Sequence, residues 1–145
     1  MYRNVKILVL NGPNLNLLEK RSIENYGSKS LKEIEDIVIN EFNNHQIEFF
    51  QSNLEGELID KIQVAQNSFD GLIINPGGYS HTSVAIKDAL EICSIPKIEV
   101  HLSNLAYRED FRYNMITASS CDGYMSGFRE NSYLGAVFLL EKLIR

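Results

Sequence analysis

Several features are absent from this 145-residue sequence, and each absence excludes a class of protein. No apolar run approaches the length of a membrane span, so no transmembrane helix is expected. No run of basic residues occurs and the formal net charge is −5, which argues against nucleic acid as a partner. Residues 1–4 lead directly into the first expected strand and leave no room for a signal peptide. We therefore expect a cytoplasmic protein that binds neither nucleic acid nor membrane.

Cysteine and histidine are also scarce. Cys93 and Cys121 lie far apart in apolar contexts and are expected to be reduced core residues rather than a disulfide or a metal pair. The three histidines, His45, His81 and His101, are scattered and form no His-x-x-x-His pair, so a metal site is not expected. His45 follows the end of a predicted helix and is expected to be solvated.

The sequence alternates short apolar runs with longer amphipathic stretches. Five runs are predicted to form buried strands, at residues 5–10, 47–51, 71–75, 97–101 and 123–125. Capping-box patterns at Ser30 and Glu33, and at Ser52 and Glu55, precede two of the helical stretches between them. Strands that alternate with helices predict an α/β fold with a parallel sheet. Because no linker or repeat interrupts the pattern, we expect a single catalytic domain over residues 1–145. Its expected fold is a flavodoxin-like three-layer sandwich with a five-stranded parallel sheet of order 2-1-3-4-5.

Polar residues should gather where such a sheet binds its ligands, outside the carboxyl ends of the strands near the reversal of strand order. The sequence Asn-Gly-Pro-Asn-Leu-Asn follows the first strand at 11–16, and Asn-Pro-Gly-Gly-Tyr-Ser-His ends the third at 75–81. The fourth strand ends in His101, Ser103 and Asn104. The sequence therefore predicts a ligand site beside the first, third and fourth strands.

Arg21 and Tyr26 lie in the 18-residue polar connection that precedes Ser30, called here the lid segment (residues 12–29). Connections of this length often close over a binding site. A guanidinium beside a phenol favours the phenolate, which could take a proton from a carbon next to a ketone. Taken alone, these two residues are more simply explained as a surface tyrosine that packs beside a surface arginine.

The segment 98–104, Ile-Glu-Val-His-Leu-Ser-Asn, places polar side chains at alternate positions of an apolar strand. Glu99, His101 and Ser103 would share one face, because strand side chains alternate. A buried carboxylate and imidazole are costly unless they are paired. His101 could protonate a departing hydroxyl, with Glu99 orienting the ring and stabilising its cation. A solvated edge strand, or a histidine hydrogen-bonded for packing, remains an alternative.

Three multi-residue motifs and a fourth partial one resemble the type II 3-dehydroquinate dehydratase family. They are NGPNLNLL at 11–18, NPGGYSHTS at 75–83, EVHLSN at 99–104, and Arg108-Glu109 followed by Phe111-Arg112. The resemblance spans nearly the whole chain. It implies a flavodoxin-like lyase of the shikimate pathway of aromatic amino-acid biosynthesis. Such an enzyme converts 3-dehydroquinate to 3-dehydroshikimate and water by anti elimination through an enolate, with neither metal nor organic cofactor.

The resemblance also implies catalytic roles for five residues. Tyr26 matches the base that removes the C2 proton, and Arg21 matches the cation that favours its phenolate. Asn14 matches the residue that holds the enolate oxygen through a water. His101 matches the general acid that protonates the leaving C1 hydroxyl, and Glu99 matches its orienting carboxylate.

Substrate contacts follow from the same resemblance. Asn75, Leu102 and Ser103 match the pocket for the substrate carboxylate, while His81 and Arg112 match contacts to the ring hydroxyls. Asp88 matches a residue that reaches the site from a neighbouring subunit. The implied assembly is a homododecamer, a tetramer of trimers.

The chain departs from the family's pattern in the lid segment and near its carboxyl end. Glu19 stands where a glycine is usual, Ser22 and Ile23 replace Glu-Pro, and Arg129 stands where a glycine is common. Loss of Gly and Pro changes backbone flexibility and the preset φ angles. We expect these changes to affect lid motion and rate more than the type of reaction.

Three other functions would suit the same pattern of elements. A flavodoxin-like electron carrier would need a hydroxyl-rich phosphate loop after the first strand, where this chain has Asn-Gly-Pro-Asn. A receiver domain would need an acidic pair there and an aspartate ending the third strand, where the chain has Asn11 and Asn75. The third alternative is a protein that resembles this family but only assembles and does not catalyse the reaction.

Overall fold

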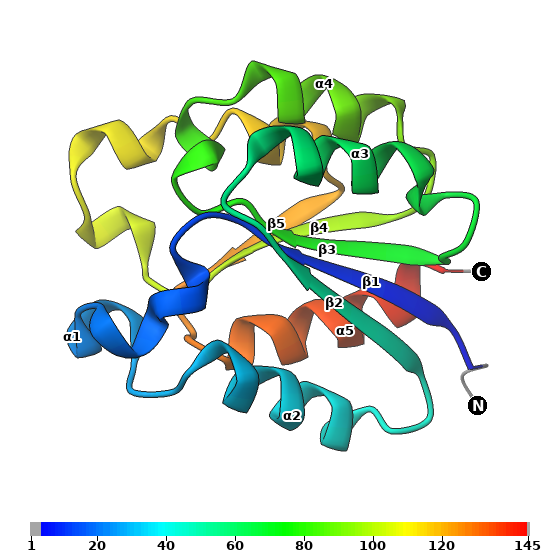
Figure 1. Ribbon diagram of the computed structural model, residues 1–145, viewed down its shortest axis with the longest axis horizontal. Helices are drawn as coiled ribbons and strands as arrows, with labels where there is room; N and C mark the ends of the chain where they lie inside the picture. Colours follow the sequence, from blue (N-terminus) through cyan, green and yellow to red (C-terminus); the bar gives the residue numbers. More distant parts are fainter. Residues whose placement is uncertain (1–3, 145) are drawn as a thin grey trace.

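A computed structural model describes residues 4–144, so the first three residues of the expected leaderless start lie outside the described part. Five parallel strands form one sheet in the order β2-β1-β3-β4-β5, as the sequence predicts (Figure 1). Their bounds are β1 Lys6–Asn11, β2 Gln46–Gln51, β3 Gly71–Asn75, β4 Lys97–His101 and β5 Gly123–Ser126. The observed bounds of β3 and β4 match the predicted ones. β1 begins and ends one residue later than predicted, β2 begins one residue earlier, and β5 ends one residue later.

Helices cover both faces of the sheet (Figure 1). α2 (Leu31–Glu41) and α5 (Asn131–Leu143) cover one face, and α3 (Glu55–Ala65) and α4 (Val84–Ile92) cover the other. Alternate side chains of β1 separate into two cores: Ile7 and Val9 enter one, while Leu8 and Leu10 enter the other. Burial on both faces explains the apolar runs of β1 and β3, whereas β4 is equally buried but carries Lys97, Glu99 and His101 among its apolar residues. None of the helices in residues 4–144 is long and apolar enough to cross a membrane.

Two helix starts and one histidine test the local predictions. The capping box of α2 is confirmed: Ser30 accepts from the Glu33 amide at 3.1 Å and Glu33 accepts from the Ser30 amide at 3.1 Å. The Ser52–Glu55 box is wrong, because α3 begins at Glu55 and Ser52 instead donates to Glu57. The solvated His45 is also wrong: its ring is buried and lies 2.7 Å from Glu141 of α5.

Short helices replace the expected loop between β1 and α2. The lid segment contains a 3-10 helix (Leu15–Lys20) and one turn of α-helix, α1 (Ile23–Tyr26). α1 lies at the end of the sheet where the strands finish, whereas β1 begins and α5 ends toward the opposite end (Figure 1). Three further 3-10 turns, Leu105–Tyr107, Asp110–Tyr113 and Thr117–Ser120, follow β4. The polar clusters predicted from sequence are therefore gathered at one edge of the sheet.

Candidate active site

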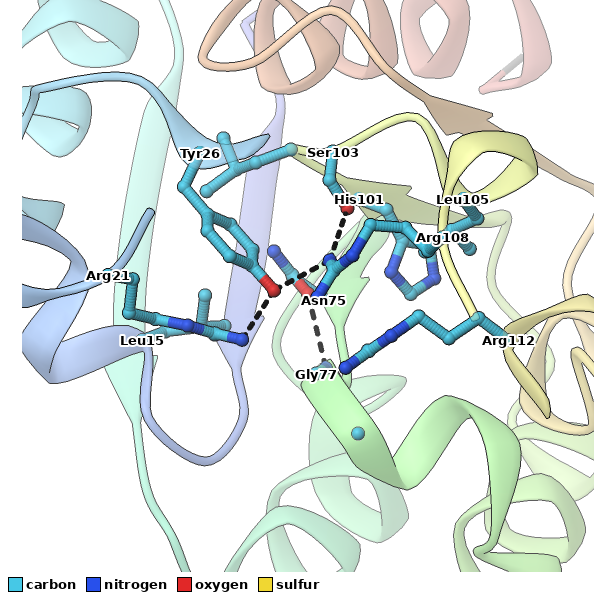
Figure 2. Close-up of a pocket in the computed structure, with 12 residues that line it drawn as sticks. Leu15, Arg21, Tyr26, Asn75, Gly77, His101, Ser103, Leu105, Arg108 and Arg112 are labelled. Carbon is cyan, nitrogen blue, oxygen red and sulfur yellow. Dashed lines mark hydrogen bonds between the residues drawn. The ribbon is translucent and has the colours of Figure 1, made fainter. Parts of the chain in front are cut away.

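A pocket at the carboxyl ends of the strands collects residues from four separate parts of the sequence (Figure 2). Close approach of the loops after β1 and β3 builds its floor. A Cβ on Gly12 would lie 2.6 Å from the Pro76 carbonyl oxygen, so only glycine fits there. The lining consists of Leu15, Arg21, Tyr26, Asn75, Gly77, Gly78, His101, Leu102, Ser103, Leu105, Arg108 and Arg112.

Tyr26 is 8% exposed and its hydroxyl oxygen accepts hydrogen bonds from two guanidinium groups (Figure 2). Arg21 donates through Nη2, and Arg108 donates through Nη1 at 2.7 Å. The guanidinium carbons of Arg21 and Arg108 also lie 3.9 and 5.1 Å from the centre of the phenol ring. Burial lowers the pKa of Arg21, yet a guanidinium remains protonated in any ordinary buffer. Two guanidinium donors therefore occupy the Tyr26 oxygen as a hydrogen-bond acceptor inside the pocket.

Glu99 is fully buried and its carboxylate is held by three neighbours. One oxygen, Oε2, lies 2.7 Å from His101 Nε2 and accepts from the Ser80 hydroxyl at 2.7 Å. The other, Oε1, accepts from the Thr117 hydroxyl at 2.5 Å. These bonds fix the His101 ring and give a protonated imidazole a buried counter-charge. The alternative of a solvated edge strand is wrong, because β4 is fully buried between β3 and β5.

His81 lies beside His101, with ring centres 6.2 Å apart. Its Nδ1 lies 3.2 Å from the Asn114 carbonyl oxygen, which makes Nδ1 the donor. Nε2 is then an acceptor, and it is buried without a hydrogen-bond partner among the described residues. Burial lowers the pKa of His81, so the neutral ring is favoured. A substrate hydroxyl is a suitable donor for this nitrogen.

Asn75 is positioned by a buried network below the pocket. Its Oδ1 accepts from the Gly77 amide at 3.1 Å, and its Nδ2 donates to the Tyr133 hydroxyl at 3.0 Å. Tyr133 in turn donates to Asn11 Oδ1 at 2.5 Å. Because Tyr133 is completely buried and its pKa is raised by burial, its hydroxyl stays a neutral donor. The second Asn75 amide hydrogen is left for a ligand.

Comparison with known proteins decides the family. The model for "Dehydroquinase class II" matches residues 5–141. The chain is 51% identical to 3-dehydroquinate dehydratase of Carboxydothermus hydrogenoformans, over 97% of this chain and 94% of that protein. It is 48% identical to the enzyme of the same name from Clostridium perfringens strain SM101, over 97% and 99%. The chain belongs to the class II dehydroquinase family.

Solved dehydroquinase structures confirm the fold. The type II dehydroquinase of Butyrivibrio crossotus superimposes with a TM-score of 0.90 at 45% identity, over 94% of this chain and 97% of that one. That of Propionibacterium acnes gives a TM-score of 0.90 at 32% identity, over 98% and 99%. Family membership sets aside the electron-carrier and receiver-domain alternatives.

Two residues that the dehydroquinase resemblance assigns to the site lie outside the pocket of a single chain. Asn14 is exposed, has φ 69°, and its amide donates to Asn53 at 3.1 Å. Asp88 is exposed on α4. Neither lines the pocket, whereas the other assigned residues line it, apart from Glu99 and His81, which contact or stack on His101.

Sequence reasoning gave no role to several residues of this dehydroquinase site. Arg108 belongs to a sequence motif but has no predicted role. In the structure its Nη1 donates to both the Tyr26 oxygen and the Ser103 hydroxyl, the latter at 2.9 Å. Ser80 and Thr117, which hold Glu99, carry no spacing signal that would identify them. Arg108 follows the polar end of the fourth strand by a few residues, and this place near the predicted ligand region is a signal that could have identified it.

Proposed function

We propose that this class II dehydroquinase converts 3-dehydroquinate to 3-dehydroshikimate and water, with Tyr26 as the base. The observation that carries the assignment is the Tyr26 oxygen, which accepts from both Arg21 and Arg108 inside the pocket. An oxygen held in this way is suited to accept a proton and is not suited to donate one. The reaction begins with proton abstraction beside a ketone, which needs such a group.

The first step moves one proton and one electron pair. The Tyr26 phenolate takes the proton from C2, and the C2–H electrons form the enolate with the C3 carbonyl oxygen. Asn14, through a water, is proposed to bind that oxygen as its charge develops. Preorganised donors of this kind typically lower a barrier by about 3 kcal/mol. The exposed position of Asn14 leaves room for that water.

The second step expels the C1 hydroxyl. The enolate re-forms the ketone, the C1–O bond breaks, and His101 delivers a proton so that water leaves. Glu99 is 2.7 Å from Nε2 of that ring, orients it and supplies a neighbouring negative charge. Base and acid come from the lid segment and from β4, which is compatible with anti elimination across the ring. The ketone itself accepts the electrons, so the steps require no cofactor.

Substrate binding requires the pocket to open. The cavity inside the present arrangement is about 20 Å³, which is room for about one water molecule. Arg108 reaches across it from Ser103 to Tyr26 (Figure 2). We infer that the substrate carboxylate displaces Arg108 from Ser103 and binds Asn75 with the amides of Leu102 and Ser103. His81 and Arg112 then contact the ring hydroxyls.

Assembly completes the proposal. Asp88 would reach the site of a neighbouring subunit, since its own chain leaves it exposed and away from the pocket. Exposed aromatic side chains around the edge strand β5 offer a surface for subunit contact: Tyr107, Phe111, Tyr113 and Tyr124. We propose a cytoplasmic homododecamer in which each chain is one catalytic domain.

The test is direct, because the product is an enone that absorbs in the ultraviolet. Purified protein is expected to raise the absorbance on addition of 3-dehydroquinate, at the same rate with and without a metal chelator. A folded, assembled protein that gives no absorbance change would contradict the proposal and favour a non-catalytic, purely assembling role. A rate abolished by the chelator would contradict the metal-free mechanism.

A further inference from the structure

The lid segment is joined to the rest of the molecule through α1 by two side-chain hydrogen bonds among the described residues. One is the Arg108–Tyr26 bond inside the pocket. The other lies outside it, where Arg129 Nη2 donates to the Glu24 carbonyl oxygen at 3.1 Å. Substrate entry must disturb the first bond, because the pocket has no room otherwise. The second can persist while substrate is bound.

Arg129 adopts a backbone conformation that a residue with a Cβ rarely takes. Its φ is 53°, in the left-handed region that favours glycine. The side chain nevertheless fits its surroundings closely: a Cβ on Gly27 would lie 3.3 Å from Arg129 Cδ. Gly27, at the end of α1, therefore leaves the space through which the arginine reaches Glu24. A disfavoured backbone that delivers a side chain to one specific carbonyl indicates a positioning role.

The turn that carries Arg129 is also tied to the acid side of the pocket. The Arg129 amide donates to the Leu102 carbonyl at 2.9 Å, and the Ser132 hydroxyl donates to the His101 carbonyl at 3.1 Å. Lys29 and Glu130 add an ion pair at 3.5 Å beside the same turn. One turn thus connects α1, which carries Tyr26, to the end of β4, which carries His101.

Packing alone does not hold α1 on this side. A cavity of about 680 Å³ lies between α1 and the segments that follow β4 and β5, lined by Glu24, Asn25, Asn104, Tyr107, Gly127 and Arg129. The outer surface of α1 is open as well, with Ile23 64% exposed. Tyr26 packs into the hydrophobic core on the inner side of α1, whereas the bond from Arg129 holds the outer side of this one-turn helix at Glu24.

We propose that Arg129 is a positioning residue, an outer clasp (Arg129 to Glu24 O) that holds α1 closed over the pocket and keeps the base facing the acid. The kinetic part of this inference rests on the proposed function. The structural part does not, since it concerns the closure of α1 in the free protein.

The experiment compares Arg129→Gly and Arg129→Asn with the wild type. Both residues tolerate the left-handed conformation, and neither reaches Glu24, so the backbone is preserved while the clasp is lost. Lys20→Ala is the matched control, because it removes one positive charge from the lid segment without removing the clasp. Arg129→Lys, which keeps the charge and most of the stem, is expected to retain part of the effect.

Hydrogen exchange of residues 23–27 is the first measurement, made without ligand. The amides of Tyr26 and Gly27 bond within α1, and their exchange is expected to rise about fivefold in both clasp variants, the effect of one modest hydrogen bond. KM for 3-dehydroquinate is expected to rise about fivefold, with kcat changed less than about twofold, since closure contributes to binding. Lys20→Ala should change neither quantity.

Unchanged exchange and unchanged KM in both clasp variants would overturn the inference. A fall in melting temperature with equal losses in kcat and kcat/KM would overturn it as well, in favour of a purely structural role. Absence of turnover in the wild type would instead refute the proposed function. The hydrogen-exchange result would still test whether Arg129 holds α1 closed.

Discussion

Among single residues, the buried Glu99 carboxylate is the one that connects the proposed acid, His101, to the core of the fold. It has no exposed surface and binds His101, Ser80 and Thr117. A carboxylate buried in this way is costly unless it is hydrogen-bonded, and both Glu99 oxygens have such partners. Its position therefore specifies which way the His101 ring points and which form of that ring is stabilised.

Glu99→Gln keeps the shape and removes the charge. We expect kcat to fall about a hundredfold, because the protonated His101 loses its counter-charge, while KM changes far less. Ser80→Ala is the control, since it removes one donor to Glu99 and leaves the charge. Steady-state kinetics and far-ultraviolet circular dichroism of both variants provide the measurement; retention of wild-type kcat in Glu99→Gln would argue against the acid role of His101.

His81 makes a testable contribution to pH-dependent stability. Burial lowers its pKa in the folded protein below the ordinary value of 6.5. As pH falls below about 6.5, the unfolded chain takes up a proton that the folded chain does not, so stability is lost down to the lowered pKa. His81→Gln should therefore lose less unfolding free energy than the wild type between pH 7.5 and pH 5.5. Parallel urea titrations at both pH values check this, and identical pH dependence in the two proteins would contradict it.

Local sequence signals decide some elements and leave others to tertiary contacts. α2 belongs to the first kind, since both hydrogen bonds of its capping box form. Ser30→Ala should reduce the free energy of unfolding by about 1 kcal/mol. Ser28→Ala, in the preceding exposed turn, should be close to neutral. Denaturant unfolding measures both, and equal effects of the two substitutions would show that the cap is not what stabilises α2.

Prediction from sequence succeeded for elements whose burial determines the order of apolar residues along the chain. β3 is buried on both faces, and its apolar run marks its ends clearly; β4 is buried as well, although Lys97, Glu99 and His101 alternate with its apolar residues. The helices of the lid segment were missed, because a four-residue helix such as α1 owes its stability to contacts elsewhere in the chain. Ser52 is not a cap because α3 begins only at Glu55, with Leu54 at the N-cap, and the Ser52 oxygen accepts from the Leu54 amide before the helix starts.

The site was likewise predictable only in part. Residues at strand ends could be placed together from topology alone, and Tyr26, Asn75, His101 and Ser103 do line one pocket. The contact of Arg108 with Tyr26 joins residues 82 positions apart, and no local spacing announces it. Arg129 differs again, since only its observed φ and the space beside Gly27 reveal what its side chain contacts.

Whole-molecule organisation determines whether a single chain is a complete enzyme. Asp88 is proposed to serve a neighbouring subunit, which makes a complementation experiment decisive. A hybrid oligomer of Tyr26→Phe and Asp88→Ala chains contains some sites with both Tyr26 and a partner's Asp88. Co-expression of the two variants should therefore give activity above the sum of the separate proteins. No gain, in oligomers shown to be mixed, would place Asp88 outside the site or within its own.

The central claim is that the Tyr26 oxygen, held by Arg21 and Arg108, is the base of the reaction. Tyr26→Phe removes that oxygen and leaves the ring to fill the same space, so kcat measured by enone absorbance tests it most directly. The account predicts a loss of about a thousandfold in kcat, with secondary structure and oligomeric mass unchanged. Turnover within a few-fold of the wild type would contradict it.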